Sequence, residues 1–231
     1  MSDIFREVDE EVRQDKAKEV WKKYGIHIMG LAVLIVVCVG SFKAWQYYSV
    51  QKLEQAGADY LNSVTLIDNG KDADALEAFQ VLSKKGTTGF YLLSKFQEAG
   101  LLAKTGKNDD ALEIYDALAG NSALENNLRD LAKLRAGLLL SNTSSFTEVE
   151  ARVGDLAKTG NSWRHSALEV LAVTAFRTGD LVKADQFFNQ LSADLTTPSS
   201  MRVRAAAMSS IITPQLPAKT PKKQETKPDA Q

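Results

Sequence analysis

The feature of this sequence that most limits its possible folds is an apolar stretch near its start. Residues 25–42, GIHIMGLAVLIVVCVGSF, contain no Asp, Glu, Lys or Arg. The apolar character continues past Lys43 as far as Tyr48, and no second stretch of this kind occurs. A helix needs about 20 mostly apolar residues to cross a bilayer core, so the stretch predicts a single membrane span.

A buried core helix and a cleaved signal peptide are the two alternatives for this stretch. A signal peptide has a short basic start and a cleavage site of small residues. Here the preceding segment is long and mixed in charge, and bulky aromatic residues follow the stretch. We therefore predict an uncleaved signal anchor over residues 24–48.

Lysines and arginines beside the span set its predicted orientation, because cytoplasmic flanks carry the excess of basic residues. Five lie at positions 13–23, directly before the apolar stretch, and two, Lys43 and Lys52, lie within a similar distance after it. This difference predicts a cytoplasmic N-terminus and a following domain on the other side of the membrane. Aromatic residues at the two edges suit the interfacial belts of a bilayer. We assign five as membrane anchors: Trp21, Tyr24, Trp45, Tyr47 and Tyr48.

Composition and motifs argue against several classes of function. Residues 50–212 carry 17 basic and 20 acidic residues, a net charge of −3, and so lack the basic footprint of a nucleic-acid-binding domain. The single cysteine, Cys38, excludes an intrachain disulfide. The histidines, His27 and His165, lack the partners of a metal site, and no P-loop, GxSxG or GxGxxG motif occurs. We expect a protein that is not an enzyme and uses no cofactor, metal or small-molecule substrate.

An internal repeat of about 36 residues is the second informative feature. Residues 70–82, GKDADALEAFQVL, recur as residues 106–118, GKNDDALEIYDAL, and less closely as residues 179–191, GDLVKADQFFNQL. The last copy lies two repeat lengths plus one residue beyond the second, and residues 147–156 form a degenerate copy between them. A period near 34 with Gly, then Ala, then an aromatic residue is typical of tetratricopeptide-type helix pairs.

Each copy is predicted to be the second helix of a pair. The predicted first helices and a final unpaired helix cover residues 53–67, 90–104, 124–140, 163–177 and 201–212. The Gly turns the chain, the Ala permits close helix approach, and the aromatic ring fills the space beside it. The predicted packing residues are Gly70, Ala75, Phe79, Gly106, Ala111, Tyr115, Gly179, Ala184 and Phe188. The fold prediction is all-α: one transmembrane helix, then an α-solenoid over residues 49–212, with a generic helical bundle as the alternative.

Two terminal tails flank these regions. Residues 1–23 place Ile4, Val8 and Val12 on one helical face and predict an amphipathic cytoplasmic tail. This tail is either a docking peptide or a solvated retention segment. Residues 213–231 are rich in Pro and Lys and predict a disordered tail.

Trp163, Arg164 and His165 are the strongest candidates for contact with a partner protein. Trp and Arg dominate the binding energy of protein interfaces, and these residues are adjacent in the sequence. The alternative is that Trp163 packs between repeats, since Trp is usually well buried.

The tail SDIFREVDEEV, the span near residue 30 and the segment SWRHSALEVLAVTAFRTGD together resemble the YfgM-like ancillary subunits of the bacterial protein-translocation channel, of the alphaproteobacterial type. The resemblance covers nearly the whole chain except the Pro/Lys tail, and the repeats depart from the consensus over residues 142–154. It implies an inner-membrane protein with a periplasmic repeat domain. It also implies partnership with translocon channel subunits and periplasmic chaperones, with no catalytic residues.

The combined prediction is a non-enzymatic adaptor whose concave face, lined by the first helices, binds a chaperone or an unfolded segment. A scaffold for envelope or cytochrome assembly would use the same architecture with other clients. A regulator acting through residues 1–23 and a membrane-anchored enzyme are the remaining alternatives.

Overall fold

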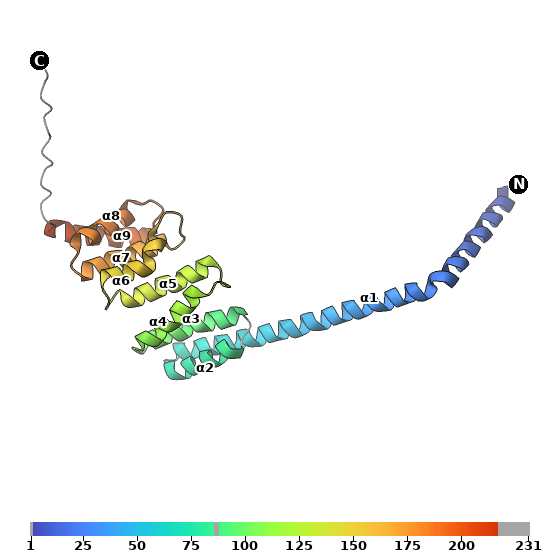
Figure 1. The fold of residues 1–231 in the computed structure, drawn as a ribbon, viewed down its shortest axis with the longest axis horizontal. Coiled ribbons are helices and arrows are strands. Elements are labelled where there is room, and N and C mark those ends of the chain that lie inside the picture. The colour runs from blue at the N-terminus through green and yellow to red at the C-terminus, as the bar shows by residue number, and fades with distance from the viewer. Residues whose placement is uncertain (1, 86–87, 217–231) are drawn as a thin grey trace, which may run out of the picture. The chain divides into compact units, whose positions relative to one another are not determined.

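The computed structural model describes residues 2–85 and 88–216, which form nine α-helices and two short 3-10 helices without strands (Figure 1). The all-α prediction is therefore confirmed. The α-helices are α1 Ser2–Asp68, α2 Asp72–Lys85, α3 Thr88–Lys104, α4 Asn108–Gly120, α5 Asn126–Leu140, α6 Phe146–Val153, α7 Arg164–Arg177, α8 Leu181–Ala193 and α9 Ser199–Ile212. The 3-10 helices are Gly154–Ala157 and Thr213–Gln215.

The chain divides into two compact units, Met1–Asn62 and Ser63–Gln231. The first unit consists of most of α1, one helix that runs through the predicted tail, the predicted span and most of the predicted first repeat helix. The predicted boundaries at residues 23/24 and 48/49 lie inside this helix and stay predictions. A helix can continue here because no Pro interrupts it and Ala, Leu, Lys, Glu and Gln are frequent.

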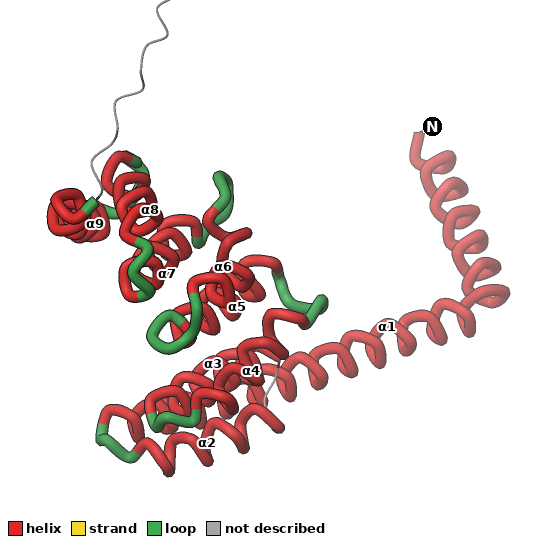
Figure 2. The backbone as a smooth tube through the Cα atoms, turned by 60° about the vertical axis from the view of Figure 1, so that its left-hand side comes forward, coloured by secondary structure: helices red, strands yellow, loops and turns green. Residues whose placement is uncertain are grey.

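The second unit is an α-solenoid in which helices pack in sequence order (Figure 2). Each of α3 to α5 contacts the helix before and after it, and the same holds for α6 to α8. Helices α5 and α7 also touch, which brings the first helices of two successive pairs together. We call α3, α5, α7 and α9 the first-helix layer, and α2, α4, α6 and α8 the second-helix layer. This nearest-neighbour pattern is the architecture that the repeat predicted.

Three of the four turns between paired helices close at a glycine with positive φ, while the turn between α5 and α6 contains no glycine. Gly106 has φ of 81° and Gly179 has φ of 84°, values that cost little only without a Cβ. At the turn before α4, the Gly106 N–H donates to the carbonyl of Ala103, and the N–H of Lys107 donates to the carbonyl of Leu102. Gly179 repeats this pairing, and both turns therefore satisfy the helix-end carbonyls in the Schellman manner. Gly70, with φ of 72°, makes the same turn before α2.

The predicted small side chains on the second helices occupy completely buried positions. Ala75, Ala111 and Ala184 have no exposed surface. Ala111 lies in a core cluster with Tyr115, while Ala184 and Phe188 belong to a larger cluster spanning α5 to α9. Phe79, the remaining predicted aromatic, is also completely buried.

The degenerate copy at residues 147–156 packs against its first helix with different residues. Here α6 has eight residues, starts with a capping box between Ser145 and Glu148, and continues into a 3-10 turn. Its buried residues are Phe146, Val149 and Val153. Close approach to α5 is instead permitted by Gly137, where a Cβ would lie 2.3 Å from the Cγ1 atom of Val153. In this pair the small residue thus lies on the first helix, α5, and the large buried residues lie on the second, α6.

The start of the predicted disordered tail belongs to the folded unit. Thr213–Gln215 form a 3-10 turn, and Leu216 packs against the core cluster of α5 to α9. The remainder of that prediction, residues 217–231, lies outside the described residues.

Replacing Gly137 by Ala should destabilise the solenoid by about 1–3 kcal/mol, because the new methyl group would clash with Val153, a fully buried β-branched side chain that has few alternative rotamers. Gly100→Ala is the matched control, since Gly100 lies in helix α3 with nothing within 4 Å of an added Cβ. It should stabilise by about 0.5–1 kcal/mol through helix propensity. Urea unfolding followed by circular dichroism measures both; a neutral Gly137→Ala would contradict the close approach.

Candidate interaction surfaces

The apolar segment of α1 exposes large side chains around its whole circumference. Almost every large apolar residue from Ile26 to Phe42 has about half or more of its surface exposed. A helix that is apolar on all sides suits a lipid environment. One candidate membrane span occurs among the described residues, in the stretch beginning at Trp21. The five predicted membrane anchors are all exposed: Trp21, Tyr24, Trp45, Tyr47 and Tyr48.

A lysine accompanies a tyrosine at each end of this segment. The Lys23 Nζ lies 5.4 Å from the ring centroid of Tyr24, and the Lys52 Nζ lies 4.6 Å from that of Tyr48. Cation–π pairs of this kind combine a ring that prefers the interface with an amine that reaches water. The two pairs are therefore suited to the two edges of a bilayer.

Trp163 connects two successive first helices. Its Nε1–H donates to the backbone carbonyl of Asn127, 3.0 Å away and 36 residues earlier in the sequence. Its ring is half-buried and packs against the core cluster of α5 to α9. The residue thus holds the start of α7 against the start of α5.

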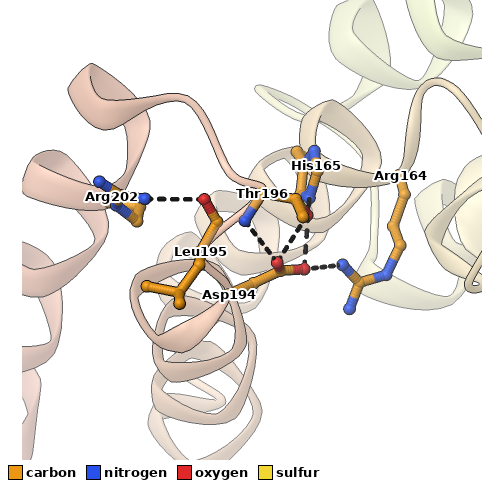
Figure 3. A network of polar contacts seen from close by, with 6 residues as sticks. All are labelled: Arg164, His165, Asp194, Leu195, Thr196 and Arg202. Carbon is orange, nitrogen blue, oxygen red and sulfur yellow. Dashed lines mark hydrogen bonds and ion pairs between the residues drawn. The ribbon is translucent and has the colours of Figure 1, made fainter.

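Arg164 and His165 face inward, toward the loop that joins α8 to α9 (Figure 3). Arg164 forms an ion pair with the carboxylate of Asp194, and the His165 Nε2 lies 3.3 Å from the same carboxylate. Thr196 completes the network: its hydroxyl and its backbone N–H donate to Asp194 at 2.6 and 2.9 Å. The hydrogen bonds from Thr196, followed by the contact with Arg164, hold the pKa of Asp194 far below its ordinary value.

Each of the three residues predicted to touch a partner is therefore engaged inside the repeat domain. Trp163 and Arg164 connect α7 to α5 and to the α8–α9 loop. A role in partner contact stays a prediction for them, and it would use only the exposed edges of the network.

The structure also exposes apolar residues that were not among the predicted contact residues. Leu138 on α5, Val173 and Phe176 on α7, and Ile211 on α9 are all exposed. We call these four residues the apolar strip. Leu138 and Val173 are 35 residues apart, as are Phe176 and Ile211, so equivalent positions of successive first helices carry them. That repeat-length spacing was the available signal, but helical periodicity by itself does not distinguish a buried apolar face from an exposed one.

Polar contacts fix the alignment of the helices that carry the apolar strip. The Arg177 Nε donates to the carbonyl of Ser141 at 2.7 Å, which joins the C-terminal ends of α7 and α5. Arg204 on α9 pairs with Glu169 on α7 at 2.7 Å. Since these links also span 36 and 35 residues, α5, α7 and α9 lie in register by one repeat length.

An open hollow of about 220 Å³ lies between α3 and α4, with Tyr91, Lys95 and Glu113 among its lining residues. Its one basic and one acidic side chain give it no net preference for a charged ligand. No group of three or more His, Cys, Asp or Glu that could hold a metal ion occurs in the described part of the chain.

A family model described as a tetratricopeptide repeat-like domain matches residues 18–205. The chain belongs to this tetratricopeptide repeat-like family. The match includes the candidate membrane span and extends to the middle of α9. No curated protein matches the sequence. Repeat domains of this family are typically non-enzymatic scaffolds for protein–protein interaction, which agrees with a binding role for the solenoid.

Replacing Asp194 by Asn should lower the Tm of the repeat domain at neutral pH, because Arg164 loses its ion pair. The folded-state pKa lies below the ordinary value of 3.8, so the stabilisation is complete above that value and is lost as the pH falls through the acid range. The difference in Tm between wild type and D194N should therefore be constant near neutrality and shrink below about pH 4.

Asp155→Asn is the control for this measurement, since Asp155 pairs with Lys158 at an exposed site and ties no two helices together. It should leave the Tm almost unchanged at neutral pH. Equal Tm values for D194N and D155N at pH 7 would show that the network does not stabilise the fold.

Proposed function

We propose that this protein is a single-pass, membrane-anchored adaptor that presents a repeat solenoid to protein partners. The observation that supports this most strongly is the combination of a candidate span in α1 with a tetratricopeptide repeat-like domain in the same chain. The span supplies location, and the repeats supply an extended binding surface. Neither part presents a recognised catalytic motif.

The proposed location is the bacterial inner membrane, with residues 1–23 in the cytoplasm and the repeat domain in the periplasm. The basic residues before the span support this orientation, because their excess is typical of cytoplasmic flanks. Residues 213–231 would then be periplasmic as well.

The proposed partners are translocon channel subunits beside the span and a periplasmic chaperone or an emerging client chain on the solenoid. The resemblance to YfgM-like ancillary subunits is the basis for these partners. A scaffold for envelope or cytochrome assembly shares every structural feature described above and differs only in the partner bound.

The orientation is tested by fusing alkaline phosphatase, which is active only after export, to the C-terminus of the full chain in bacterial cells. We expect an active fusion, and an inactive one would contradict the orientation. Replacing the five basic residues at positions 13–23 by Gln should reduce the activity, because the charge difference that sets the topology is removed. Replacing Lys43 and Lys52 by Gln is the control and should leave the activity unchanged or higher.

The partners are tested by placing a photoreactive residue at Gly40 in the span and, separately, at Val173 in the apolar strip. Both positions are open: nothing lies within 4 Å of a Cβ at Gly40, and Val173 is exposed. We expect crosslinks to channel subunits at Gly40 and to a chaperone or emerging chain at Val173. Assembly factors at both positions, without any channel subunit, would contradict the translocon role and favour the assembly scaffold.

A further inference from the structure

Charge is distributed unevenly between the two helix layers of the solenoid. The first-helix layer, α3, α5, α7 and α9, contains nine basic and three acidic residues, a net charge of +6 with His165 neutral. The second-helix layer, α2, α4, α6 and α8, contains four basic and ten acidic residues, a net charge of −6. The near-neutral total therefore conceals one basic and one acidic layer.

Several arginines of the first-helix layer keep their charge uncompensated. Arg129 and Arg202 donate to the backbone carbonyls of Ala119 and Leu195. Arg177 likewise donates to backbone carbonyls, and Arg135 is exposed on α5. Within the described residues none of the four forms an ion pair with a carboxylate, and a carbonyl orients a guanidinium without cancelling its charge.

Two of these arginines, Arg135 and Arg177, lie next to residues of the apolar strip in the sequence. Arg135 precedes Leu138 by one helical turn, and Arg177 follows Phe176 directly. The strip itself exposes 49% of Leu138 and 43% of Val173, a large fraction for apolar side chains at adjoining helices. Glu169 lies one turn before Val173, but it is paired with Arg204, so among the described residues the charge beside the strip that has no ion-pair partner is basic. Exposed apolar residues bordered by unpaired charge of one sign are typical of a site for a partner of the opposite sign.

We propose that this surface binds an extended acidic segment of a partner protein, in which apolar side chains are interspersed with Asp and Glu. The inference rests on the proposed function and specifies its partner. The carboxylates of such a segment would face the arginines of α5 and α7, while its apolar side chains would cover the strip. Nucleic acid matches the charge but offers a phosphate backbone and no flexible apolar side chains for Leu138, Val173 and Phe176.

The test uses the full chain in neutral detergent and a fluorescein-labelled acidic peptide that contains Leu and Phe, with binding followed by anisotropy. We expect saturable binding that weakens as salt is added. Arg135→Glu should weaken it about five- to tenfold, because reversal replaces attraction by repulsion. Val173→Ser should weaken it without changing the salt dependence, since it removes apolar contact only. Lys84→Glu makes the same charge change at an exposed site on α2 and should have no effect.

Four results would overturn the proposal. The first is equal loss in the Arg135→Glu and Lys84→Glu proteins when both retain the wild-type melting curve. The second is that a peptide with its acidic residues replaced by Lys, or with its apolar residues replaced by Ser, binds as tightly as the original peptide. The third is tighter binding of single-stranded DNA or of phosphatidylglycerol vesicles. The fourth is concentration-dependent self-association that Arg135→Glu abolishes, which would assign the surface to a second copy. None of these results would affect the expected crosslinks from Gly40 to channel subunits. The adaptor role and the acidic partner are therefore tested by different measurements.

Discussion

The solenoid depends on the close approach of neighbouring helices at positions where one side chain is reduced to a methyl group or a hydrogen. Ala75, Ala111 and Ala184 supply these positions on three of the second helices, and Gly137 supplies one on α5. A larger residue at any of them would separate two helices and weaken the dispersion contacts of the surrounding aromatic and aliphatic groups. Since every pair contacts only its neighbours, each such position stabilises the stack locally, and the whole domain is the sum of these local interfaces.

Polar contacts between successive repeats follow the same period. Arg152 reaches Asp116, Trp163 reaches Asn127 and Arg177 reaches Ser141, in each case 36 residues earlier. An interaction one repeat length apart is what a stack of equivalent units must produce, because equivalent positions become neighbours in space. The Asp194 network adds a contact of another kind, which ties the loop after α8 to the first turn of α7 and so secures the last pair.

The same layering decides what the solenoid can bind. The first-helix layer is rich in basic residues and the second-helix layer is rich in acidic residues. The domain therefore has two layers of opposite charge although its net charge is small. Net charge measured along the sequence averages over both layers, so it describes the total and conceals the local potential. The apolar strip lies on the first-helix layer, beside its arginines. A partner with both carboxylates and apolar side chains matches the arginines and the strip, whereas a partner with phosphates alone matches only the arginines.

The sequence by itself determined the apolar segment, the all-α class, the turn glycines at positions 70, 106 and 179, and the last residues of α3, α5, α7 and α9. These properties depend on local chemistry: length and polarity, helix propensity, and the steric freedom of Gly at positive φ. Only the tertiary structure decided that Gly137 meets Val153, that Trp163 and Arg164 are engaged within the domain, and that Leu138 and Val173 are exposed. Helical periodicity shows that a face is apolar, but which helix covers that face, or whether any does, depends on how distant segments pack.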